Sequence, residues 1–176
     1  MQAVTLPRKS PEFAIQMPDG KQLLLSSYRG KPVVLAFILT TCPHCQAYTR
    51  LLMKAQTDYG PRGLQIVESA IEEKAKPAVP GFIRAFQPPF PVGYNEYITA
   101  VDFLQHPRME VLHMPVAVFI DRQGMILAQY TAADPFMQEN IAEKSLRAKI
   151  EELLASGAAP AAKTPAKKTA AAAKKK

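Results

Sequence analysis

The sequence predicts an α/β domain in which helices pack on a central mixed β-sheet. Residues 33–39 form an unbroken apolar run, which is typical of a strand buried on both faces of a sheet. A helical pattern follows this run, and residues 64–71 then read as a second apolar strand. The order strand, helix, strand indicates a right-handed βαβ unit with its two strands parallel.

The 176 residues suit one domain with enough apolar side chains for a core. The net charge of +7 is uneven, because residues 157–176 hold six of the 22 basic residues and no acid. The remaining chain carries 16 basic against 15 acidic side chains. We therefore predict a domain at residues 1–156 and a disordered tail at residues 157–176, rich in Lys, Ala and Pro. The tail either binds nucleic acid or anionic surfaces electrostatically or is a solubilising extension.

We expect neither a signal peptide nor a membrane-spanning segment, because the first residues of the sequence lack an apolar stretch of the required length. We expect a cytoplasmic protein, or a periplasmic or extracytoplasmic one if a leader has been removed. Its two cysteines are too few for a disulfide framework. They are better explained as a redox-active or metal-binding pair.

The remaining elements follow from turn signals and apolar periodicity. Residues 12–17 and 21–26 flank a Pro-Asp-Gly turn and predict a β-hairpin. The middle of the chain predicts, in order, a loop at 74–80, a short helix at 81–87, a short strand at 90–93, and a helix from a cap at Asn95 to Pro107.

The last third of the domain contains a second predicted hairpin and the clearest helix. An apolar strand opened by Pro115 turns at residues 122–124 into a strand at 125–131. We then expect Asp134 to cap a helix that has Pro135 at its first position and ends at Gly157. The apolar stripe of this helix is Ile141, Leu146, Ile150, Leu153 and Leu154.

The two cysteines, Cys42 and Cys45, stand where the buried strand passes into a helix. Pro43 lacks an N–H and suits the first helical position, which makes Cys42 the N-cap. There the helix dipole and unpaired N–H groups favour the thiolate, and His44 adds a positive charge or a hydrogen bond. Cys45 lies within the first turn, close enough to form a disulfide. We predict that Cys42 is the exposed nucleophile and Cys45 the buried, resolving thiol.

Several motifs resemble the redoxin branch of the thioredoxin superfamily, which includes AhpC/TSA-type and TlpA/ResA-like proteins. They are SPEF at 10–13, the turn at 19–20, the segment 25–31, CPHC at 42–45, and MP at 114–115 leading to FIDRQG at 119–124. The similarity spans about residues 10–155 in the same order. It implies a thioredoxin-like fold, with an N-terminal β-hairpin and an insertion before the proline-led strand.

The resemblance also implies roles for individual residues. Cys42 would attack and Cys45 would resolve, while Pro115 would be a cis-proline beside the disulfide that lets the Met114 backbone pair with a substrate peptide. Thr41, Pro43 and His44 complete the expected substrate-binding or activating set. The predicted activity is thiol-disulfide exchange with protein or small-thiol partners in cell redox homeostasis. We expect a monomer without cofactor or metal. The Pro-His dipeptide between the two cysteines resembles that of DsbA, an oxidant.

The sequence departs from the redoxin pattern at four positions. Thr41 replaces the usual Trp, Ala36 the buried aspartate of thioredoxin, Tyr48 a glutamate common in TlpA-like reductases, and Arg50 a helix-kinking proline. Because neither position 36 nor position 48 carries a carboxylate, we expect another group or water to handle the proton of Cys45. Reductase turnover is the activity that these departures support least.

Two other functions fit part of the pattern. A peroxiredoxin, with antioxidant activity, needs Thr or Ser three residues before its cysteine and Pro seven before, but these positions are Leu39 and Leu35. A zinc or copper(I) module would draw on His113 and Met114, together with the cysteines and His44. His44 lies between the two cysteines and points awkwardly for sharing their metal.

Overall fold

The computed structural model describes residues 4–156, so the predicted tail at 157–176 lies outside the described residues. An eight-stranded sheet has the order β1-β8-β7-β4-β5-β6-β2-β3. Its strands are β1 (Arg8–Lys9), β2 (Ala14–Gln16), β3 (Gln22–Leu24), β4 (Val33–Ile38), β5 (Gln65–Ala70), β6 (Val92–Tyr94), β7 (Val116–Ile120) and β8 (Met125–Thr131). The central strand β4 pairs parallel with β5 and antiparallel with β7, so the predicted mixed sheet is confirmed.

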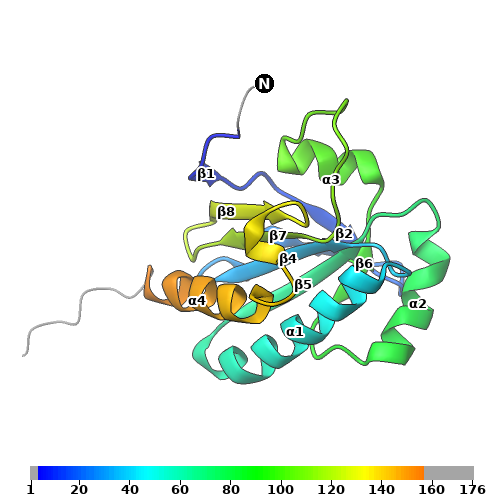
Figure 1. The fold of residues 1–176 in the computed structure, drawn as a ribbon. Helices are drawn as coiled ribbons and strands as arrows, with labels where there is room; N and C mark the ends of the chain where they lie inside the picture. The colour runs from blue at the N-terminus through cyan, green and yellow to red at the C-terminus, as the bar shows by residue number, and fades with distance from the viewer. Residues whose placement is uncertain (1–3, 157–176) are drawn as a thin grey trace, which may run out of the picture.

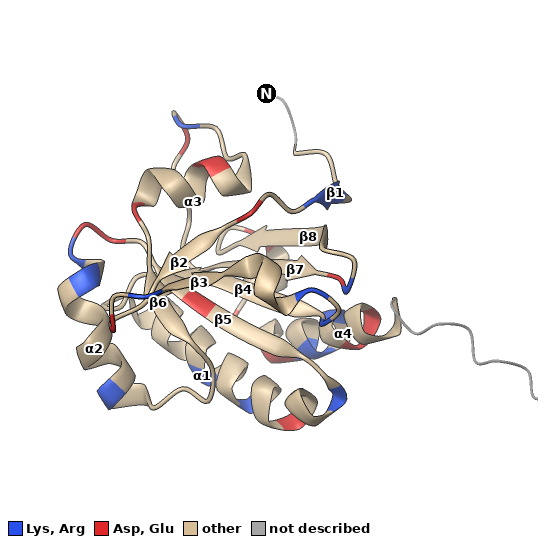
Figure 2. Cartoon of the chain, turned by 180° about the vertical axis from the view of Figure 1, so that it is seen from behind, with Lys and Arg blue, Asp and Glu red and all other residues tan. Residues whose placement is uncertain are grey.

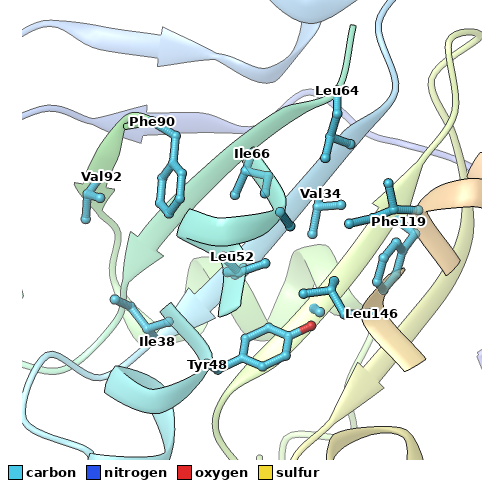
Figure 3. Packing of buried hydrophobic residues seen from close by; sticks show 14 of the residues in the cluster. Val34, Ile38, Tyr48, Leu52, Leu64, Ile66, Phe90, Val92, Phe119 and Leu146 are labelled. Carbon is cyan, nitrogen blue, oxygen red and sulfur yellow. The ribbon is translucent and has the colours of Figure 1, made fainter. Parts of the chain in front are cut away.

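Helices cover both faces of the sheet (Figure 1). They are α1 (Pro43–Tyr59), α2 (Ala75–Phe86), α3 (Tyr97–Leu104) and α4 (Ala142–Ala155). Side chains of β4 alternate between two cores, as the period of a strand requires. Val34, Ala36 and Ile38 pack with α1, α2 and α4, whereas Val33, Leu35 and Phe37 pack with α3. Figure 3 shows the first of these cores, which is the one that holds the cysteine pair.

The elements next to the cysteines form as the sequence predicts. All six residues of β4 are buried, and α1 begins at Pro43 with Cys42 as its N-cap. The predicted hairpins appear as β2 with β3 and as β7 with β8, both antiparallel. Strand β1 was not predicted, because its two residues are too few for an apolar pattern; it adds an edge to β8.

The predicted loop at residues 74–80 is wrong, because helix α2 begins at Ala75 and runs through Pro77 and Pro80. Pro77 falls in the first turn, where backbone N–H groups have no partner within the helix. Pro80 removes one interior hydrogen bond, but burial of Val79 and Phe82 against the sheet compensates for it. The predicted short strand also moves, to β6 at Val92–Tyr94.

Asn95 was expected to cap the next helix, and that prediction is wrong. Helix α3 starts after Glu96, without a side-chain cap. The buried Asn95 amide instead accepts from Ser69 Oγ at 2.7 Å and donates to the Ala14 carbonyl at 2.8 Å. These bonds tie β5 to β2 across β6, so tertiary contacts outcompete the local cap at this position.

The start of the last helix also differs from the prediction. Asp134 and Pro135 open a short 3₁₀ helix at Pro135–Met137, and α4 begins only at Ala142. Asp134 Oδ2 accepts from the Thr131 backbone N–H at 2.6 Å, which ends β8 rather than starting α4. Of the predicted stripe, Ile141 is exposed, while the other four side chains are buried; the predicted C-cap, Gly157, lies outside the described residues.

Candidate active site

Cys42 occupies the junction between β4 and α1. Its backbone is extended, with φ −78° and ψ 121°, and its N–H donates to the Leu39 carbonyl at 3.1 Å. Its own carbonyl accepts the first bond of the helix, from the Gln46 N–H at 2.9 Å. This geometry places the half-buried Cys42 side chain beside the unpaired N–H groups of the first turn of α1.

Cys45 lies one turn into α1 and is fully buried. Its Sγ accepts a hydrogen bond from the Leu39 N–H at 3.4 Å. Burial raises the pKa of this thiol strongly, against the Leu39 bond, and Cys42 and the charge of Glu68 raise it further. Both cysteines are free thiols in the structure. The pair thus combines the partly accessible sulfur of Cys42 with the sulfur of Cys45, which is buried away from solvent.

The loop before Cys42 is held by a carboxylate that sequence analysis missed. Glu72 Oε1 accepts from the Thr40 N–H at 2.9 Å and also from the Thr40 hydroxyl. Gln46 Nε2 donates to the Thr40 carbonyl at 2.9 Å. Glu72 follows β5, and Gln46 lies on α1, so both neighbouring elements fix the loop that presents Cys42.

A groove with a volume of 430 Å³ lies beside the cysteine motif. Pro43 and His44 line it from α1, and Pro115, which precedes β7, lines it as well. The Met114–Pro115 peptide bond is cis, as the resemblance implied. The structure therefore brings three of the predicted substrate residues to one groove. The other two, Thr41 and Met114, are exposed and half-buried respectively and do not line it.

The metal ligands considered above do not form a cluster. His113 is exposed, and within residues 4–156 no three His, Cys, Asp or Glu side chains are grouped so as to hold a metal ion. The same part of the chain has no helix that is long and apolar enough to span a bilayer.

A buried polar cluster lies behind Cys45, between α1 and β5. Glu68 Oε1 accepts from the Thr49 hydroxyl at 2.8 Å, and both residues are fully buried. Burial raises the pKa of Glu68 to about 8, although the Thr49 bond opposes the shift. The hydroxyl of Tyr48 is also buried and has no partner, and Figure 3 shows its ring among the core residues near Leu146.

The model of the AhpC/TSA family matches residues 7–129, which is more than half of the chain. The chain belongs to the AhpC/TSA family.

Several proteins similar to this chain are named as thiol-disulfide oxidoreductases or interchange proteins. A thiol-disulfide oxidoreductase ResA from Bacillus thuringiensis subsp. konkukian (strain 97-27) is 23% identical over 122 residues, 69% of this chain and 67% of the relative. A thiol:disulfide interchange protein of the thioredoxin family from Chlorobium tepidum TLS matches with a TM-score of 0.69 and 20% identity, covering 86% of this chain and 99% of that one. A thiol:disulfide interchange protein from Bacteroides sp. matches with a TM-score of 0.67 and 17% identity, covering 88% of this chain and 93% of that one. The fold of this AhpC/TSA protein is thus thioredoxin-like.

The sequence did not predict that Glu68, Glu72 and Thr49 contribute to the surroundings of the cysteines. Glu68 had a visible signal, because it is the one acid within the apolar strand at residues 64–71. A charge inside a buried strand is rare without a partner or a role. Glu72 and Thr49 carried no such signal, since their partners come from other elements of the fold.

Proposed function

We propose that this protein is a thiol-disulfide oxidoreductase that exchanges the Cys42–Cys45 pair with the dithiols and disulfides of protein substrates. One observation carries the proposal: an accessible cysteine at a helix N-terminus is followed, one turn later, by a sealed one. Cys42 can react with a substrate disulfide, whereas the buried Cys45 can react only with Cys42. The names of the ResA relatives support the same chemistry.

Substrate reduction has two steps. The Cys42 thiolate attacks one sulfur of a substrate disulfide, the S–S bond breaks, and the released substrate sulfur leaves as a thiolate that takes a proton from solvent. Cys45 then gives up its proton and attacks Cys42 Sγ, which expels the second substrate thiolate and forms the Cys42–Cys45 disulfide. Two electrons pass to the substrate, and the reverse sequence oxidises a substrate dithiol.

The groove supports a peptide as the substrate rather than a small thiol alone. It places apolar surface from Leu51 and Met137 next to the polar His44, Gln138 and Glu139. The cis-proline Pro115 also lines the groove, together with Pro43 and His44 of the cysteine motif. An extended segment in this groove would bring its cysteine to Cys42 and leave Cys45 covered.

Peroxide reduction as the main activity has no comparable support. The positions that a peroxidase uses to hold peroxide are Leu35, which is fully buried, and Leu39, which is half-buried. Neither side chain can donate or accept a hydrogen bond.

The test is equilibration of the purified chain in a glutathione redox series, with the thiols trapped and weighed by mass spectrometry. We expect a two-electron transition between dithiol and disulfide. A midpoint near or above about −180 mV would make the protein an oxidant or isomerase, and one near about −270 mV a reductase. If no Cys42–Cys45 disulfide forms at any glutathione ratio, the proposal is wrong.

Single substitutions assign the two roles. Cys42→Ser should abolish exchange with a disulfide-bonded peptide, and Cys45→Ser should accumulate a mixed disulfide between Cys42 and the peptide. The chain has no other cysteine, so each variant keeps a single thiol and the trapped species is unambiguous. The double variant is the thiol-free control. Full activity of either single variant would contradict the two-step scheme.

A further inference from the structure

Glu68 is a carboxylate placed inside the core. It lies on β5 between Ile66 and Ala70, whose side chains pack in the core shared with α1. Since alternate residues of a strand share a face, Glu68 points to the same side, and it has no exposed surface. In Figure 2, β5 carries red within the sheet, and Glu68 is its only acidic residue.

Only one of the two carboxylate oxygens of Glu68 has a hydrogen-bond partner. Oε1 accepts from Thr49, but Oε2 is buried without a hydrogen-bond partner. The neighbours in register on the flanking strands, Ala36 on β4 and Val92 on β6, cannot provide one. A charged carboxylate with an open oxygen in a core is costly, whereas a protonated one has a hydroxyl to donate. The site therefore favours taking up and releasing a proton.

The groups that face this carboxylate belong to the cysteine site. Cys45 and Thr49 are separated by four residues on α1, which puts them on one helix face, and Thr49 bonds directly to Glu68. Burial raises the pKa of both Cys45 and Tyr48, and the negative charge of Glu68 raises both further. Among the described residues, these two are the groups whose pKa Glu68 affects. The other ionisable side chains that pack in this core are tyrosines, namely Tyr59 on α1, Tyr94 on β6 and Tyr130 on β8.

We propose that Glu68 is the group that exchanges the proton of Cys45 in each catalytic cycle, a role that rests on the thiol-disulfide exchange proposed above. When a substrate disulfide is reduced, the Cys45 proton passes to the Glu68 carboxylate as the Cys45 sulfur attacks Cys42. When a substrate thiolate attacks Cys42 of the oxidised pair, Cys45 leaves as a thiolate and takes its proton from Glu68. Besides Cys42, Glu68 is the ionisable group whose charge acts on Cys45.

The proton is supplied from a strand next to the expected one. Ala36 stands where thioredoxin has its buried aspartate. Glu68 is the direct partner of Ala36 in the register of β4 and β5. Tyr48, the other expected position, leaves its hydroxyl unpaired. With a pKa of about 8, Glu68 is mostly protonated at neutral pH. At that pH the site is thus set to protonate a departing Cys45 thiolate, which favours oxidation of the substrate.

The test compares the wild-type chain with Glu68→Gln, which preserves the shape of the side chain and a bond to Thr49 but cannot carry the proton. Reduction of the Cys42–Cys45 disulfide by dithiothreitol is followed by stopped flow from pH 5 to 10, with rates expressed per reductant thiolate. We expect the wild-type rate to fall as the pH passes about 8 and the variant to be at least about tenfold slower below that pH, without the inflection. Glu73→Gln, which removes an exposed carboxylate beyond the same strand, is the matched control.

Two outcomes would overturn the proposal. One is a Glu68→Gln profile within twofold of wild type across the pH range. The other comes from Thr49→Val, which keeps the carboxyl group but removes the bond that lowers its pKa. The inflection must then move to higher pH, and an unmoved inflection would belong to another group. A wild-type chain that forms no Cys42–Cys45 disulfide would instead refute the proposed function itself.

Discussion

The burial of Glu68 leads to a quantitative prediction about how the free energy of unfolding depends on pH, and this prediction does not depend on catalysis. The Glu68→Gln variant should be more stable than its parent at high pH and similar to it in acid. The pKa of Glu68 rises from 4.5 to about 8 on folding, mainly because of burial. The folded chain therefore binds this proton more tightly than the unfolded chain, so the stability it contributes is complete below pH about 4.5, declines between about 4.5 and 8, and is constant above.

The size of the effect follows from the same two values. A pKa that rises from 4.5 to about 8 corresponds to at most about 5 kcal/mol of unfolding free energy lost across that interval. Solvent that enters the site on ionisation reduces the loss, but an unpaired buried carboxylate still costs at least about 2 kcal/mol. Glutamine does not ionise, so the variant avoids this loss entirely.

The assay is urea unfolding followed by circular dichroism at pH 5 and pH 9. Both chains carry Cys42→Ser and Cys45→Ser, so that no thiol titrates in the interval. The other ionisable groups are common to the two chains, and their effect cancels in the difference. We expect the stability difference between variant and parent to grow by about 2 to 4 kcal/mol from pH 5 to pH 9. A difference that stays constant within about 1 kcal/mol would refute the assignment of a proton to buried Glu68.

Three further predictions concern the core and the groove. A Cβ at Gly93 would lie 2.5 Å from the Gln16 carbonyl oxygen, so Gly93→Ala should destabilise the fold by about 3 kcal/mol, measured by urea unfolding. Leu52→Ala, in the fully buried core behind the cysteines, should cost about 2–5 kcal/mol in the same assay, and a loss below 1 would contradict the packing. His44→Ala should slow exchange with a disulfide-bonded peptide severalfold, whereas His113→Ala, which removes an exposed histidine outside the groove, should leave the rate unchanged.

Local patterns predicted the part of the site that lies on one continuous stretch of chain. The seven apolar residues before the motif indicated a buried strand, and Pro43 indicated where the helix begins. Both signals act over a few residues, so no distant contact was needed to interpret them. The position of Cys42 as an N-cap and the burial of Cys45 follow from the same pattern.

Errors occurred where a distant partner competed with a local preference. Asn95 is a good cap by type, but Ser69 and the Ala14 carbonyl offer it buried hydrogen bonds. Asp134 is likewise taken by the end of β8, and α4 starts later. The prolines of the segment after β5 suggested a loop, yet one sits in a first turn and the apolar face of α2 is buried against the sheet.

By itself, the sequence determined the βαβ unit, the cysteine pair at its centre and a thiol chemistry for that pair. Apolar periodicity and the residue preferences at a helix N-terminus depend only on residues that are close in the sequence. Only the tertiary structure decided which acid lies behind Cys45, because the register of β4 against β5 puts Glu68 opposite Ala36 and the packing of α1 puts Thr49 on its carboxylate. A carboxylate becomes a proton carrier for a thiol when the fold buries both together, and a linear sequence does not contain that proximity.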